Sequence, residues 1–126
     1  MAVSDRHIYG WAKERELTPR VSEFFGDKVS RSLYRYEHTD FETDLYFAEL
    51  KSRRTFDSKF YDSWMVPCCK FDKVGKEICI LYHWDGDDSM WYYIYDRNHQ
   101  RFFTYTTNEN GQPTWLVPKW LFTPTE

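Results

Sequence analysis

The sequence predicts a mixed α/β or α+β fold with one central sheet flanked by helices. The 126 residues are 41% hydrophobic and 21% aromatic, which is enough for one core and fits a single domain over residues 1–126. Hydrophobic residues follow helical spacing in two places and strand spacing between and after them. The apolar runs fall far short of the roughly 20 residues that cross a bilayer. We therefore expect a cytoplasmic protein without membrane contact.

The first helix is expected within residues 11–25. Four residues recur there at helical spacing: Glu14, Leu17, Val21 and Phe24. Gly26 follows the pattern and is typical of a helix end. Pro19 disturbs this pattern, because proline inside a helix removes a hydrogen bond. Either the helix begins near Thr18, with Thr18 as its N-cap, or it is kinked at Pro19.

Two extended runs follow, at 32–38 and 45–51, and a turn at 42–44 leads into the second. Both faces of the run at 45–51 are largely apolar. This pattern is typical of a central strand that is covered on both sides.

A second, short helix is expected at 68–74, with Pro67 in its first turn and Gly75 at its end. Three more strands are expected, at 77–84, 90–95 and 102–105. Asn110-Gly111 indicates a turn before a tail at 115–122.

Two charged residues interrupt the apolar strand at 45–51. Glu49 and Lys51 lie two positions apart, so their side chains leave the same face of a strand. A buried charge is costly unless it is paired or binds a metal, so either an ion pair or a functional site explains them. Asp57-Ser58-Lys59 has the same spacing, but it falls in a polar turn that does not fix its geometry.

Asp40 adds a third charged group to this strand. A hairpin through residues 42–44 would return the chain so that Asp40 lies beside Glu49. Carboxylates are the ligands that Mg²⁺ prefers, and a neighbouring lysine can polarise water or steady a phosphate. These groups suit phosphodiester hydrolysis. Asp44 is a rival for Asp40, because it directly precedes the strand, although its place in the turn leaves it more exposed.

These motifs resemble the PD-(D/E)XK nuclease superfamily, which includes restriction enzymes, Holliday-junction resolvases and phage endonucleases. The resemblance lies in Asp40-Phe41, the eight residues between Asp40 and Glu49, Glu49-Leu50-Lys51, and the acidic helix before them. The chain looks most like small phage and viral nucleases of that superfamily over roughly residues 9–70. The residues that carry this narrower likeness are Tyr9-Gly10, Lys13-Glu14, Met65-Val66-Pro67 and Lys70. Thr39 stands where the family name has a proline.

The resemblance implies a restriction-endonuclease-like core and a metal-dependent endonuclease that cuts DNA, branched or duplex. Asp40 and Glu49 would bind Mg²⁺ or Mn²⁺, and Lys51 would act on the attacking water or the phosphate. Glu14 on the first helix would be a further acidic group. Lys70 would reach the site from the second helix, although a solvated lysine explains it slightly better.

Positive charge is concentrated in the middle of a chain whose net charge is −3. Residues 51–76 contain seven basic residues against three acidic ones. Arg53, Arg54 and Lys59 lie in this segment and suit backbone phosphates, although surface solubility explains them nearly as well. A homodimer is expected on geometric grounds, because one small domain covers little of a DNA substrate.

Other functions remain open at this level. A catalytically inactive nucleic-acid- or protein-binding module on the same fold is the main alternative, and an inhibitor that uses the acidic region 85–96 is a third. The aromatic run Trp91-Tyr92-Tyr93 and Tyr95 could stack on bases, but core packing explains it better. The histidines and the three cysteines show no zinc spacing.

Overall fold

One long helix, α1 (Asp5–Phe25), opens the fold and continues through Pro19. The computed structural model describes residues 5–26, 29–31 and 40–126. The helix begins earlier than the segment 11–25 expected from the sequence, and Thr18 is not its N-cap. Instead, Thr18 Oγ1 donates a hydrogen bond to a carbonyl one turn earlier, at 2.6 Å. Gly26 ends the helix as predicted, with a positive φ of 67° that glycine adopts without strain.

The large sheet is mixed, as the sequence predicted. It has six strands in the order β1-β2-β3-β5-β6-β9. Their bounds are β1 (Ser30–Arg31), β2 (Phe41–Glu42), β3 (Tyr46–Arg53), β5 (Glu77–Trp84), β6 (Ser89–Ile94) and β9 (Thr123–Pro124). Strands β3 and β5 are parallel and the other pairs are antiparallel. A parallel pair needs a crossover, and here residues 54–76 supply it.

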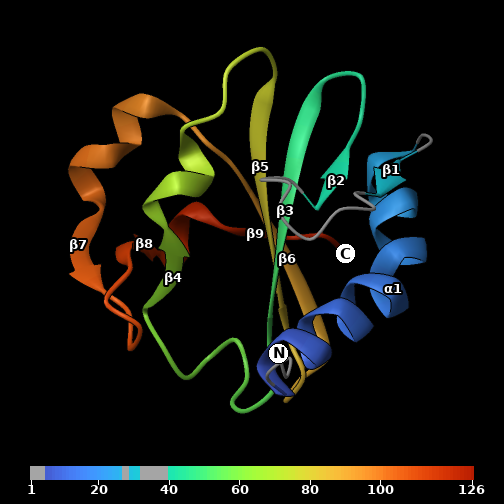
Figure 1. Cartoon of the computed structure of the whole chain (residues 1–126), viewed down its shortest axis with the longest axis horizontal. Coiled ribbons are helices and arrows are strands. Elements are labelled where there is room, and N and C mark those ends of the chain that lie inside the picture. The colour runs from blue at the N-terminus through green and yellow to red at the C-terminus, as the bar shows by residue number, and fades with distance from the viewer. Residues whose placement is uncertain (1–4, 27–28, 32–39) are drawn as a thin grey trace, which may run out of the picture.

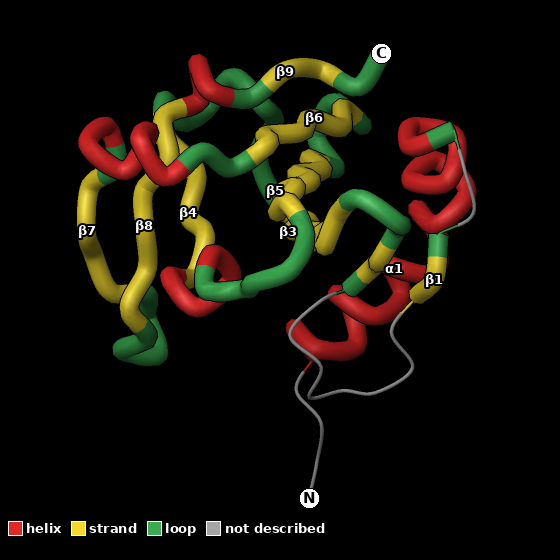
Figure 2. Tube along the Cα trace, turned by 90° about the horizontal axis from the view of Figure 1, so that it is seen from above, coloured by secondary structure: helices red, strands yellow, loops and turns green. Residues whose placement is uncertain are grey.

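The two faces of this sheet are covered differently (Figures 1 and 2). Helix α1 covers one face. The other is covered by a second sheet in the order β4-β8-β7, formed by β4 (Ser63–Pro67), β8 (Pro113–Pro118) and β7 (Thr104–Thr107). The expectation of helices on both sides is therefore wrong for this face, and the expected tail at 115–122 is strand in its first half and a 3-10 turn after it.

The second helix expected at 68–74 is only a four-residue 3-10 helix, η1 (Cys68–Phe71). The preceding residues 63–67 pair with β8, so the chain leaves a strand at Pro67 and has few residues left before Gly75. Two further 3-10 helices are η2 (Arg97–Phe102) and η3 (Lys119–Leu121).

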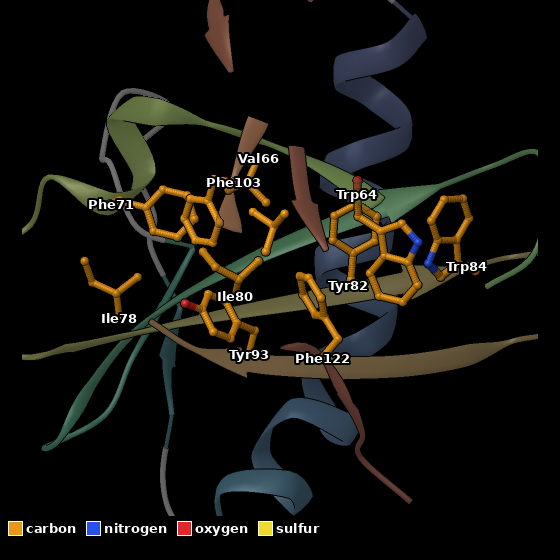
Figure 3. Packing of buried hydrophobic residues seen from close by; sticks show 11 residues of the cluster. Trp64, Val66, Phe71, Ile78, Ile80, Tyr82, Trp84, Tyr93, Phe103 and Phe122 are labelled. Atoms are coloured by element: carbon orange, nitrogen blue, oxygen red, sulfur yellow. The ribbon is translucent and has the colours of Figure 1, made fainter. Parts of the chain in front are cut away.

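Two hydrophobic cores result. Leu17 and Val21 of α1 pack on Ala48, Leu50 and Leu81. Between the sheets lies a larger aromatic core that contains Trp64, Tyr82, Trp84, Tyr93, Phe103 and Phe122 (Figure 3). Because fully burying one large apolar side chain contributes about 1.5–3 kcal/mol, this core fixes the two sheets against each other.

Two further sequence predictions concern a strand and an aromatic run. The strand expected at 32–38 lies outside the described residues. Tyr93 is 2% exposed and belongs to the aromatic core, which supports packing over base stacking for that run. No helix in the described part of the chain is long and apolar enough to cross a membrane.

Candidate functional site

Strand β3 separates apolar from charged side chains. Ala48 and Leu50 point into the core beside α1. Glu49 and Lys51 leave the opposite face, which β3 shares with its parallel neighbour β5. Glu49 is only 6% exposed and Lys51 is half-buried. The sequence prediction that both charges share one face of a covered strand is therefore confirmed.

Asp40 lies opposite Glu49 across the neighbouring strand pair. Phe41 pairs with Ala48, and the same register continued by one residue places Asp40 against Glu49. Two hydrogen bonds hold it there: the Asp40 N–H donates to the Ala48 carbonyl at 3.2 Å, and the Leu50 N–H donates to Asp40 Oδ2 at 2.8 Å. The expected hairpin therefore brings the two carboxylates together.

Asp44, the rival carboxylate, lies at the other end of β3. It is exposed in the turn before β3, and the next residue, Leu45, accepts a backbone hydrogen bond from Glu77. Asp44 precedes the first residue of β3 and Glu49 lies in the middle of that strand, so Asp40 is the carboxylate that the fold places beside Glu49.

Lys70 completes the group from the crossover. Its Nζ lies 2.9 Å from Glu49 Oε1, and the Lys70 side chain is 20% exposed. Lys70 belongs to η1, which follows β4 on the face of the large sheet that carries Glu49. The lysine is therefore paired with Glu49 and is not simply solvated, although the helix that carries it is shorter than expected.

Burial disfavours the charged forms of three of these groups, Glu49, Lys51 and Lys70. Burial and then the charge of Asp40 raise the pKa of Glu49 to about 7. Burial also lowers the pKa of Lys51, and the charges of Lys70 and Arg53 act in the same direction. Burial opposes the charged form of Lys70 too, but the Glu49 carboxylate outweighs it and leaves the pKa of Lys70 raised.

The donor set of this group suits a hard cation with water ligands. Asp40 and Glu49 offer carboxylate oxygens, and Mg²⁺ commonly binds through one or two carboxylates and keeps several waters. Within residues 5–26, 29–31 and 40–126, no group of three or more His, Cys, Asp and Glu side chains is arranged to hold a metal ion. Any metal at this site would therefore depend on water or substrate for its remaining ligands.

The other predicted residues are spread more widely. Glu14 is half-buried on α1, which packs on the face of the sheet opposite Glu49, so its role stays a prediction. Arg53 ends β3, and its Nε donates to the Tyr82 hydroxyl at 3.0 Å. The guanidinium of Arg54 lies 4.8 Å from the centre of the Tyr9 ring. Lys59 is exposed in the loop after β3.

A second charged cluster was not singled out from the sequence. His83, at the buried end of β5, places Nε2 2.8 Å from Asp88 Oδ1 and Nδ1 3.4 Å from Asp85 Oδ1. The side chain of His83 is 1% exposed. The sequence pattern that could have identified this cluster is His83-Trp84-Asp85-Gly86-Asp87-Asp88, in which a histidine near the end of an apolar strand is followed by three acidic residues.

This second cluster anchors helix α1. The Tyr9 hydroxyl donates to Asp85 Oδ2 at 2.6 Å, and Lys13 Nζ lies 2.8 Å from Asp85 Oδ1. Burial opposes the charge on Asp85, but these two donors lower its pKa. Arg20 reaches Asp88 at 2.9 Å. The hydrogen bond from His83 is the main cause that lowers the pKa of Asp88.

Comparison with known proteins adds no family to this geometry: no protein-family model, no curated protein and no solved structure matches the chain.

Proposed function

We propose that this protein is a metal-dependent endonuclease that hydrolyses DNA phosphodiester bonds, with Mg²⁺ or Mn²⁺ as its cofactor. The observation that carries the proposal is the meeting of Asp40, Glu49, Lys51 and Lys70 on one face of β3. A buried acid with a pKa near neutrality beside a lysine with a lowered pKa is typical of functional sites.

Each residue has a chemical task in this proposal. Asp40 and Glu49 supply the oxygen ligands, and the bound cation would activate water and neutralise charge on the phosphate. Lys51 Nζ holds the attacking water or donates to a phosphate oxygen, and its lowered pKa makes proton exchange easier. Lys70 Nζ neutralises Glu49 and adds a second positive charge.

The strand arrangement supports a restriction-endonuclease-like core. Helix α1 precedes an antiparallel pair, β2 and β3, and the acid-x-Lys strand β3 lies parallel to β5 after a crossover. The PD-(D/E)XK resemblance implies this succession of a helix, a mixed sheet and a further strand. The chain departs from it where β4 and η1 stand in place of a second helix.

A cleavage assay tests the proposal. The protein is incubated with branched, duplex and single-stranded DNA, each with Mg²⁺, Mn²⁺ or EDTA. We expect cleavage that needs the metal. Lys51→Ala should lower kcat by about 10²–10³-fold, the usual cost of removing one group that stabilises a transition state.

The matched control is Lys119→Ala. Lys119 lies in η3, and its Nζ lies 5.3 Å from the centre of the Trp91 ring, away from β3. Its loss should leave kcat unchanged. No cleavage of any substrate, or equal cleavage by Lys51→Ala and the wild type, would refute the proposal.

The ion pair between Lys70 and Glu49 favours a second candidate function. A lysine that already neutralises the carboxylate suits a catalytically inactive DNA- or protein-binding module. DNA binding in EDTA that stays unchanged in Asp40→Ala and Glu49→Ala, together with an absence of cleavage, would support this alternative.

A further inference from the structure

A groove of about 700 Å³ opens between the two sheets, where β3 ends. Six of its lining residues carry the argument: Arg53, Phe56, Tyr61, Trp64, Tyr82 and Trp84. Five of these are aromatic, and Arg53 stands among them as a cation. The lining is therefore suited to a flat ring with a negative charge attached.

Two of the lining residues, Phe56 and Tyr61, form an exposed aromatic cluster with Phe60, which contacts both of them but does not itself line the groove. The side chains of Phe56, Phe60 and Tyr61 are 47%, 59% and 45% exposed. The Phe56 and Phe60 rings stack with centroids 4.0 Å apart, and Tyr61 lies edge-on to both. Phe56 and Phe60 cover one face of each other's ring, and the exposed remainder of the cluster is aromatic surface on which bases of any sequence can stack.

The loop that carries this cluster is fixed in place. Ser58 donates from both its N–H and its hydroxyl to Asp87 Oδ2, at 3.2 and 2.6 Å. Gly86 donates its N–H to the Phe56 carbonyl at 3.1 Å. A Cβ on Gly86 would lie 2.4 Å from that carbonyl oxygen, so only glycine allows this approach. The rings therefore need little ordering when a ligand binds.

The groove also continues the proposed nuclease site. Lys51 and Arg53 leave the same face of β3, roughly 7 Å apart at about 3.3 Å per residue. Arg53 reaches into the groove, and the exposed Arg54 follows it. A phosphate chain passing Lys51 would therefore meet a second cation at the mouth of the aromatic groove. Glu109 is the acidic member of the lining.

Two buried donors add to the chemistry of the groove. Trp64 and Trp84 are 1% and 2% exposed, and their indole N–H groups have no hydrogen-bond acceptor in the part of the chain that the structure describes. An unsatisfied buried donor is costly. Both indole nitrogens are enclosed in this structure, so the carbonyl oxygen of an inserted base could accept from either one only after the ring has moved.

We infer that this groove binds an unpaired nucleotide of DNA, with its base against Phe56, Phe60 and Tyr61 and its phosphate at Arg53. The inference rests on the proposed function and gives it a substrate class: DNA with a single-stranded segment beside the bond that is cut. Duplex DNA keeps its bases stacked, so presenting one to the groove would cost the free energy of unpairing and unstacking it.

Binding without cleavage tests the inference. A labelled single-stranded oligonucleotide with a central 2-aminopurine, and a blunt hairpin of the same length, are titrated in EDTA. We expect tighter binding of the single strand and quenching of the 2-aminopurine emission. Phe60→Ala should weaken single-strand binding by about 5- to 150-fold, the range that corresponds to losing one base stack.

Tyr105→Ala is the matched control. Tyr105 is 59% exposed, as is Phe60, but it lies on β7. Its replacement by alanine should leave binding unchanged. Phe60→Tyr, which keeps a ring, should restore most of the affinity. Circular dichroism confirms that each variant is folded.

The outcomes separate this inference from the proposed function. Suppose that cleavage needs the metal but the single strand and the hairpin bind equally, or that Phe60→Ala has no effect on binding. The inference that the groove binds a nucleotide would then be wrong, and the proposed nuclease function would stand. Single-strand binding that depends on Phe60 without any cleavage would support the groove and refute the nuclease. If Phe60→Ala instead dissolves a dimer seen by sedimentation, the cluster is an interface between copies and the inference is wrong.

Discussion

Two clusters of charged residues in the described part of the chain differ in how well their charges are satisfied. In the cluster on β3, Glu49 is buried with its pKa raised and Lys51 has its pKa lowered, so burial opposes both charges. In the cluster at the end of β5, several donors surround Asp85 and Asp88 and lower the pKa of each.

This difference distinguishes a candidate functional site, the β3 cluster, from a structural contact between α1 and the sheet, the β5 cluster. The β5 cluster gains stability from its charges, because each carboxylate has a donor and helix α1 is tied to the sheet through Tyr9 and Lys13. The β3 cluster keeps two charges, on Glu49 and Lys51, that the fold does not favour. Such strain is expected where a substrate or cation supplies the missing interactions.

The pH dependence of stability gives the largest effect. The pKa of Glu49 rises from 4.5 to about 7 on folding, so its contribution to stability is present below pH 4.5 and is lost as pH rises to about 7. Relative to Glu49→Gln, the wild-type free energy of unfolding should fall by on the order of 3 kcal/mol across this window. Urea denaturation at a series of pH values measures it. Parallel curves would contradict the buried-acid assignment.

Metal binding at the β3 cluster should stabilise the folded protein. With Mn²⁺ or Mg²⁺ at 100 times its dissociation constant, the free energy of unfolding should rise by about 2.7 kcal/mol. Thermal melts with and without the metal test this. Asp40→Asn should abolish the shift, whereas Asp44→Asn, which changes the rival carboxylate in the distant turn, should keep it. If Asp44→Asn abolished the shift and Asp40→Asn kept it, the metal would bind at the turn before β3, and the assignment to Asp40 would be wrong.

Breaking the β5 cluster should affect stability and spare activity. Asp85→Asn weakens the contacts with Tyr9 and Lys13, so the free energy of unfolding should fall by about 2 kcal/mol. The kcat of the folded protein should stay within twofold of the wild type. A large loss of kcat in folded protein would show that the β5 cluster takes part in catalysis.

The smallest effect is expected at the rim of that cluster. Arg20 pairs with Asp88 and Glu126, whose side chains are 79% and 81% exposed. Because water and salt screen such pairs, Arg20→Gln should lower the free energy of unfolding by less than about 1 kcal/mol. The difference in the free energy of unfolding between the two proteins should shrink further in 1 M salt. Urea denaturation at two salt concentrations measures it, and a larger loss that does not change with salt would contradict this prediction.

Local pattern was sufficient for the elements that hold the β3 pair. The strand at 77–84 agrees with its prediction residue for residue, because a continuous apolar run is the pattern of a strand covered on both faces. Asp40 was preferred to Asp44 because a hairpin through 42–44 would return Asp40 to Glu49 and leave Asp44 exposed, and the observed register pairs Phe41 with Ala48.

Long-range pairing decided what the sequence could not show. Residues 63–67 become a strand because they pair with 113–118, almost fifty residues later, and this pairing shortens the helix expected at 68–74. The proline at each end of 113–118 made that segment resemble a tail. The place of Lys70 stayed open between the site and solvent for the same reason, since η1 is placed by a sheet whose strands are far apart in the chain.

The order of synthesis gives the crossover a timing consequence. Glu49, Lys51 and Lys70 all leave the ribosome before residues 113–118, yet β4, which leads into η1, is paired with β8. At about 5–20 residues per second, several seconds separate Lys70 from the strand that fixes its position. A nascent chain would therefore carry its buried acid without a settled partner, and the charged group on β3 would be complete only once β8 has been translated.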